Sequence, residues 1–180
     1  MTARARLMAL ACWLCGAAVV AAQTSSIRVT PVVADGQVLA SFAMPSAFTD
    51  DAREVMQSGL LLTFRFTITL RRPNGMWWDQ TIGETSAAAS VKFDNLTRSY
   101  QVSKMVAEHV VWSDRTMDMA QARVWMTTFD RVPIGEGLTL APNEEYYIQV
   151  RMWASPRRTF SLWPWRGDDG TGRADFTNIR

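Results

Sequence analysis

The chain has few residues that could serve as a catalytic base or a metal ligand. His109 is its one histidine, which excludes a two-histidine metal site and leaves a Ser-His-Asp arrangement one possible base. Its neighbours Val110, Val111 and Trp112 favour a β-strand, where a lone histidine is usually structural. The sequence also lacks a glycine-rich phosphate loop and a G-x-S-x-G motif. We therefore predict no catalytic residue.

Acidic residues occur in adjacent pairs that fall at expected helix starts or turns. The pairs are Asp50-Asp51, Glu144-Glu145 and Asp168-Asp169. The segment from Asp168 to Gly172 is faintly similar to a calcium loop, but calcium loops space their acids at alternate positions so that several converge. We expect solvated turns at these pairs and predict neither a metal site nor a cofactor.

The stretch most typical of a binding surface is F-S-L-W-P-W, residues Phe160–Trp165, which follows two arginines. Two tryptophans around a proline form a stiff apolar surface, and arginine beside tryptophan is typical of interface anchors. The predicted partner-binding residues are Arg157, Arg158, Phe160, Trp163 and Trp165. The alternative is that both rings fold back and close one end of the domain.

The first 22 residues have the pattern of a secretory signal peptide. Arg4 and Arg6 precede an uncharged apolar run that ends in small residues at Ala22. A retained membrane anchor is the alternative, but the run is about 16 residues where a spanning helix needs roughly 20. We predict cleavage before Gln23, a periplasmic location, no firm membrane insertion afterwards, and one mature domain over residues 23–180.

Cleavage of this segment would change the composition of the chain. Both cysteines, Cys12 and Cys15, lie within it, so the mature domain would have no thiol and no disulfide. Without Arg4 and Arg6, 17 basic residues balance 17 acidic ones. A neutral domain has no net field that attracts phosphate backbones, so nucleic acid is not expected as a partner.

Hydrophobic periodicity predicts a mainly β domain. The clearest segment is Leu62–Arg71, L-T-F-R-F-T-I-T-L-R, in which apolar and polar residues alternate without interruption. Further strands are expected at Ile27–Ala34, with Pro31 marking an edge strand, and at Val38–Phe42, Thr81–Phe93, Ser99–Met105, His109–Trp112, Leu138–Leu140, Tyr146–Trp153 and Arg173–Ile179. Short strands linked by turns favour an antiparallel, immunoglobulin-like β-sandwich.

Two helices are also expected. A short one at about 50–58 would be capped by Thr49 and ended by Gly59. A substantial one at about 115–129 would follow a cap at Ser113 or Asp114. Its core face would hold Met117, Ala120, Val124 and either Trp125 or Thr128. A strongly curved sheet wrapped on this second helix is the alternative to the sandwich.

Four stretches resemble the bacterial exported family named domain of unknown function 4390. They are S-G-L-L-L-T-F-R-F-T-I-T-L-R-R-P, V-K-F-D-N-L-T-R-S-Y-Q-V-S, P-N-E-E-Y-Y-I-Q-V-R and F-S-L-W-P-W. The family brings no established activity and no catalytic residues. Its members are often encoded beside a membrane sensor histidine kinase, which implies a kinase neighbourhood. The family has a glycine-containing turn near Ala107-Glu108-His109, which this chain lacks.

Three functions remain open from the sequence. The first is a non-enzymatic periplasmic module that binds a protein at or near the inner membrane, with the periplasmic domain of a sensor kinase as a candidate. The second is a carrier of a small apolar ligand between two sheets. The third is a hydrolase, which needs two acids from distant segments, for example Glu84 and Asp175, to meet in one cleft.

The export prediction is tested by N-terminal sequencing of protein from the periplasm. We expect the mature chain to start near Gln23 and to contain no thiol, because both cysteines precede the expected cleavage point. A periplasmic chain that still begins at Met1 would contradict the signal-peptide interpretation.

Overall fold

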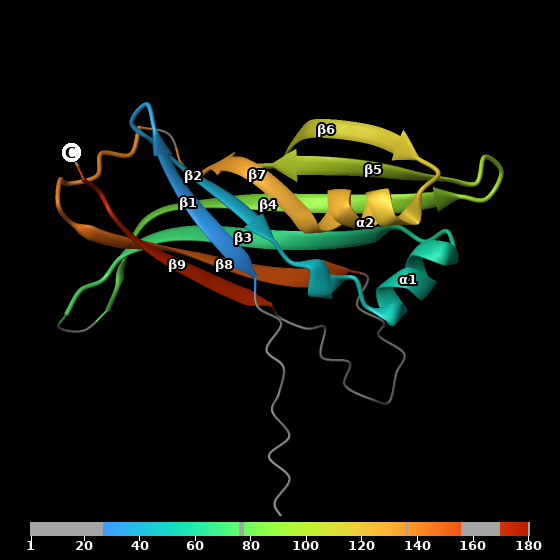
Figure 1. The fold of residues 1–180 in the computed structure, drawn as a ribbon, viewed down its shortest axis with the longest axis horizontal. Helices are drawn as coiled ribbons and strands as arrows, with labels where there is room; N and C mark the ends of the chain where they lie inside the picture. Colours follow the sequence, from blue (N-terminus) through green and yellow to red (C-terminus); the bar gives the residue numbers. More distant parts are fainter. Residues whose placement is uncertain (1–26, 76–77, 136, 156–169, 180) are drawn as a thin grey trace, which may run out of the picture.

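The computed structural model describes residues 27–75, 78–135, 137–155 and 170–179, in which two antiparallel sheets face each other (Figure 1). The smaller sheet has the order β1-β2-β7, with β1 at Arg28–Ala34, β2 at Gln37–Ala43 and β7 at Thr128–Pro133. The larger has the order β6-β5-β4-β3-β8-β9, with β3 at Leu62–Arg72, β4 at Gln80–Asp94, β5 at Ser99–Val106, β6 at His109–Thr116, β8 at Glu145–Ser155 and β9 at Thr171–Thr177. The predicted β-sandwich is confirmed. Its strands divide three and six, whereas a seven-stranded immunoglobulin domain divides four and three.

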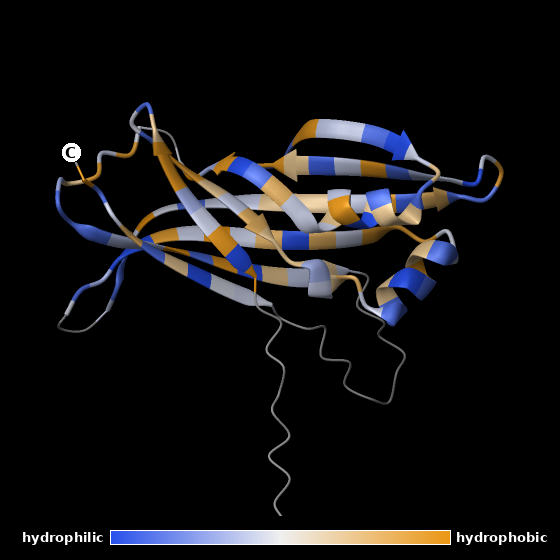
Figure 2. Ribbon diagram, viewed as in Figure 1, coloured by the Kyte–Doolittle hydropathy of each residue, from blue (hydrophilic) through white to orange (hydrophobic). Residues whose placement is uncertain are grey.

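Strand β3 lies at the centre of the larger sheet, as its alternation predicts. Its apolar residues from Leu62 to Leu70 are at most 3% exposed, whereas Arg65 points to solvent. Phe66 packs across the sandwich on Phe42 of β2 and Phe129 of β7, with ring centroids 5.0 and 5.3 Å away. Hydropathy along the ribbon alternates in the same way (Figure 2). The core therefore lies between the two sheets.

Strand β1 is an edge strand, as Pro31 predicts. Its start lies against β9, because the Ile27 amide donates to the Thr171 carbonyl at 3.2 Å. A Cβ atom at Gly172 would lie 2.3 Å from the Ile27 carbonyl oxygen, so this approach requires glycine. The two sheets are thus joined along this side.

The short helix is confirmed as α1, Asp50–Gln57. The Thr49 hydroxyl accepts from the Ala52 amide at 3.3 Å, and Val55 and Met56 are buried. A short 3-10 turn, η1 at Pro45–Ala47, precedes it. No helix in the described ranges is long and apolar enough to cross a membrane.

The prediction of a helix over 115–129 is wrong in its bounds and its buried face. Pairing with β5 carries β6 through Thr116, and the helix α2 spans only Met119–Thr127. Its cap is neither Ser113 nor Asp114 but Asp118, whose carboxylate accepts from the Ala120 amide at 2.8 Å. Met117, Ala120 and Val124, predicted to face the core, are exposed, whereas Trp125 is half-buried against it. The buried residues of α2 are Ala122, Met126 and Thr127.

The chain after α2 also differs from the sequence prediction. Thr128–Pro133 forms strand β7, which supplies Phe129 to the core, although a helix end and a loop were expected there. Leu138–Leu140 forms no strand. Leu138 instead lies where a side chain at Gly83 would be, since a Cβ there would be 2.9 Å from Leu138 Cδ1. The larger sheet faces the smaller sheet, and α2 lies beside the smaller sheet (Figure 1). The alternative prediction of one curved sheet wrapped on the second helix is therefore wrong.

The turn between β5 and β6 is made without glycine. Ala107 and Glu108 adopt φ values of 47° and 66° between the paired residues Val106 and His109. A two-residue hairpin of this kind needs positive φ at both central positions, which costs a non-glycine residue roughly 1–2 kcal/mol. The turn therefore has some cost in local stability, and the pairing of β5 with β6 shifts by one residue between Lys104 and Met105.

Truncation of neighbouring β3 residues tests the sandwich. We expect Phe66→Ala to lower the free energy of unfolding by ~3–5 kcal/mol, because it removes a ring packed on two others in the core. Thr67→Ala on the opposite face should change it by less than about 1 kcal/mol. Denaturant titration measures both, and equal losses would mean that both faces of the larger sheet are covered.

Candidate binding site

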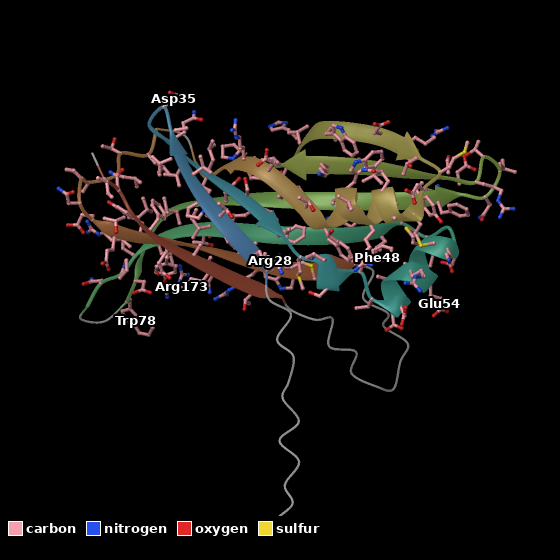
Figure 3. All side chains as sticks on the ribbon, viewed as in Figure 1. Arg28, Asp35, Phe48, Glu54, Trp78 and Arg173 are labelled. Carbon is pink, nitrogen blue, oxygen red and sulfur yellow. The ribbon has the colours of Figure 1, made fainter. Side chains whose placement is uncertain are left out.

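The hairpin between β3 and β4 presents an exposed tryptophan. Trp78 is 84% exposed and lies at the tip of the hairpin, away from the body of the sandwich (Figure 3). Tryptophan side chains are on average largely buried. A large apolar side chain that remains exposed to water is typical of an interaction surface. We therefore take this hairpin as the candidate site.

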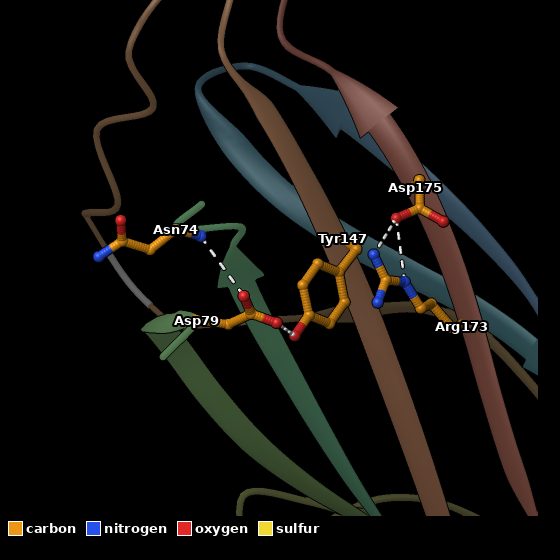
Figure 4. Close-up of polar contacts among 5 residues, drawn as sticks. All are labelled: Asn74, Asp79, Tyr147, Arg173 and Asp175. Carbon is orange, nitrogen blue, oxygen red and sulfur yellow. Dashed lines mark hydrogen bonds and ion pairs between the residues drawn. The ribbon is translucent and has the colours of Figure 1, made fainter. Parts of the chain in front are cut away.

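Polar contacts fix the base of the hairpin. Arg72 Nη2 donates to Gln80 Oε1 at 3.1 Å, which links the two strands where the turn begins. The Asn74 amide donates to Asp79 Oδ1 at 3.4 Å, and the Tyr147 hydroxyl donates to Asp79 Oδ2 at 2.5 Å (Figure 4). Asp79, the residue after Trp78, is thus bonded both to its own turn and to strand β8.

Tyr147 is held in place by two residues of β9. It lies on the outer, polar face of the larger sheet but is only 3% exposed. The Arg173 guanidinium lies over its ring, with Cζ 3.7 Å from the ring centroid. Arg173 in turn donates to Asp175 Oδ1 through Nη2 at 2.6 Å and Nε at 3.0 Å (Figure 4). The cluster therefore fastens the hairpin to strands β8 and β9.

Electrostatics keep Asp79 ionised and Tyr147 neutral. The hydrogen bond from Tyr147, followed by that from the Asn74 amide, lowers the pKa of Asp79 below 3.8, and the charges of Arg173 and Arg71 act in the same direction. Burial, followed by the hydrogen bond to Asp79, raises the pKa of Tyr147 above 10.0. The hydroxyl is therefore a donor and the carboxylate an acceptor at neutral pH. Because the two groups are hydrogen-bonded to each other, they can hold the hairpin in position.

One buried donor in this region has no partner. Arg71 lies opposite Tyr147 in the β3–β8 register, and its buried Nε–H donates to no described residue. A buried donor without a hydrogen bond lowers the stability of the fold, and an ordered water molecule commonly accepts a hydrogen bond from such a donor.

The binding residues predicted from the sequence, Arg157, Arg158, Phe160, Trp163 and Trp165, lie outside the described residues. The chain leaves β8 at Ser155, which pairs with Thr63. It returns at Gly170, whose carbonyl accepts from the Met152 amide at 2.9 Å. The prediction for this segment stays a prediction.

The other sequence candidates are not gathered in one place. His109 is exposed at the start of β6, in a strand as predicted. Glu84 on β4 and Asp175 on β9 are separated by β3 and β8, which at ~4.8 Å per strand spacing puts about 14 Å between their strands. Within the described ranges no three His, Cys, Asp or Glu residues are grouped as metal ligands.

The sequence interpretation missed the hairpin site. Its signal was present, because Trp77 and Trp78 follow closely on the turn sequence Pro73-Asn74-Gly75. Adjacent tryptophans beside a turn point to an exposed apolar tip. The contact between Asp79 and Tyr147 spans 68 residues and has no local signal.

Comparison with known families places the chain in a class of protein. Residues 21–158 match the family described as domain of unknown function (DUF4390), and the chain belongs to this family. No curated protein and no solved structure matches it. The resemblance inferred from the sequence is thus confirmed.

The role of Tyr147 is tested by following the titration of the Asp79 carboxyl carbon by NMR. In the wild type we expect a pKa below 3.8; in Tyr147→Phe it should rise toward that value, because the main stabiliser of the ionised form is lost. Since the pKa is lowered by folding, this contribution to stability is complete above pH 3.8 and is lost as the pH falls through the folded-state pKa. Tyr146→Phe is the matched control, because its hydroxyl bonds to Ala141 instead. An Asp79 titration unchanged in Tyr147→Phe would rule out this bond.

Proposed function

We propose that the chain is an exported, non-enzymatic module that binds another protein through the β3–β4 hairpin. The observation that carries the proposal is Trp78, which is exposed to 84% on a hairpin whose base is bonded to β8. Tryptophan dominates the energetic hot spots of protein interfaces. A side chain presented on a fixed hairpin loses little further freedom on binding, so more of its contact energy contributes to affinity.

The surroundings of Trp78 also suit a protein interface. Arg72 and Arg173 lie at the base of the same hairpin, and arginine, like tryptophan and tyrosine, is enriched in hot spots. A rim of charges around an apolar centre is the usual anatomy of a protein–protein contact.

The proposed partner is a protein at or near the inner membrane. This rests on the signal-peptide pattern of residues 1–22 and on the kinase neighbourhood implied by the family resemblance. The periplasmic domain of a sensor histidine kinase is the candidate that follows. The segment from Arg157 to Trp165 predicted from the sequence, which lies outside the described residues, would give a second contact.

Photocrosslinking in living cells tests the proposal. A photoreactive residue is placed at Gly75, where a Cβ atom would meet nothing within 4 Å, so the hairpin should tolerate it. We expect a discrete crosslink to an inner-membrane protein, and an at least tenfold loss of it in Trp78→Ser, since a tryptophan hot spot contributes ~2 kcal/mol or more. Thermal unfolding of Trp78→Ser should match the wild type, because the side chain is exposed.

A matched position separates specific docking from general stickiness. Leu96 is 95% exposed on the β4–β5 hairpin, at the opposite end of β4. A photoreactive residue there should not capture the same protein. Equal capture from both positions, or capture from Gly75 that persists in Trp78→Ser, would overturn the proposal.

A further inference from the structure

A cleft lies at the end of the sandwich where the β1–β2 hairpin meets the end of β9. It has a volume of about 650 Å³ and is partly open to solvent. Its described lining residues are Val33, Asp35, Gly36, Val38, Gly137, Leu138, Thr139, Leu140, Thr177, Asn178 and Ile179. Figure 3 shows Asp35 at the tip of the hairpin that forms one wall. The volume is within the range of small-molecule sites, roughly 300–1,000 Å³.

Apolar side chains line part of the cleft. Val38 and Leu140 are buried and form part of the core. Val33 and Ile179, by contrast, are 46% and 82% exposed, so apolar surface along the cleft remains in contact with water. A ligand with a short hydrocarbon chain would bury this surface, which is favourable in proportion to the area covered.

The polar side chains of the described lining are those of Asp35, Thr139, Thr177 and Asn178. Asp35 and Gly36 have φ values of 51° and 75°, the pair of positive values that a tight two-residue hairpin turn requires. Asn178 is 7% exposed, and its Nδ2 donates to the carbonyls of Leu140 and Ala141 at 3.3 and 3.1 Å. Its donors are thus used within the protein. The Asp35 carboxylate at the rim remains as the charged group.

The charge of the described lining selects the sign of the ligand. Asp35 is its one charged residue, and no arginine or lysine occurs in that lining. We propose that the cleft binds a small amphipathic cation, a protonated primary amine with a short apolar chain. The chain would lie along Val33 and Leu138, and the ammonium group would face Asp35.

Three probes of equal chain length test this site: hexylammonium, hexanol and hexanoate. Titration of the mature protein is followed by the methyl NMR signals of Val33, Leu138 and Ile179. We expect these signals to shift with the probes. Hexylammonium should bind about threefold to fivefold more tightly than hexanol, a small ratio because an exposed ion pair contributes little to affinity. It should bind about tenfold more tightly than hexanoate. Hexanoate binding as tightly as hexylammonium, or no shift with any probe, would overturn the proposal.

Variants separate the charge from the fold. Asp35→Asn should abolish the preference for hexylammonium over hexanol and leave hexanol binding unchanged; asparagine is favoured in this turn, so the hairpin should form. Glu84→Gln removes an exposed carboxylate on the outer face of the larger sheet and should keep the preference. A preference that survives in Asp35→Asn would assign it to another group and sink the inference. None of these readouts depends on Trp78 or its partner.

Discussion

The packing of three phenylalanines holds the two sheets together. Phe66 comes from the centre of β3, whereas Phe42 and Phe129 come from two neighbouring strands of the smaller sheet. Phe42 and Phe129 are opposite each other in the β2–β7 register, so their two rings pack together against the ring of Phe66. Close packing of this kind fixes the distance and the register between layers. The strands that form the hairpin and the cleft belong to these two layers.

The two sheets are connected by different contacts on the two sides of the sandwich. β1 and β9 meet through Ile27 and Thr171. Near β7, the inward-facing Lys104 donates from Nζ to the Thr128 carbonyl at 2.8 Å and lies over the rings of Trp112 and Phe129. Burial lowers the pKa of this lysine, and Asp130 partly offsets the effect. The bond from Lys104 occupies a carbonyl of β7, the edge strand of the smaller sheet, which disfavours pairing of that edge with another chain.

The sequence predicted those elements of the fold whose signals lie in neighbouring residues. The alternation in β3 and the cap at Thr49 are written in neighbouring residues, and both were predicted. The bounds of the elements between 113 and 133, and the strand β7, were not: β6, α2 and β7 follow one another with only Met117 and Asp118 between elements. Tertiary pairing with β5 and β2, which no local pattern records, decides where each begins. The cluster around Asp79 and Tyr147 was missed for the same reason.

The start of β8 shows how one short stretch can serve both proposed sites. Tyr146 and Tyr147 are consecutive, so their side chains point to opposite faces of the larger sheet. The Tyr147 hydroxyl fixes the hairpin that carries Trp78, on the outer face. On the inner face, the Tyr146 hydroxyl accepts from the Ala141 amide at 3.0 Å and so anchors the loop that lines the cleft. Glu144, two residues before Tyr146, accepts from the Asn178 amide at 3.1 Å and ties the end of β9 to the same point. Because these bonds converge on three residues at or just before the start of β8, a displacement of β8 there must alter both the hairpin and the cleft.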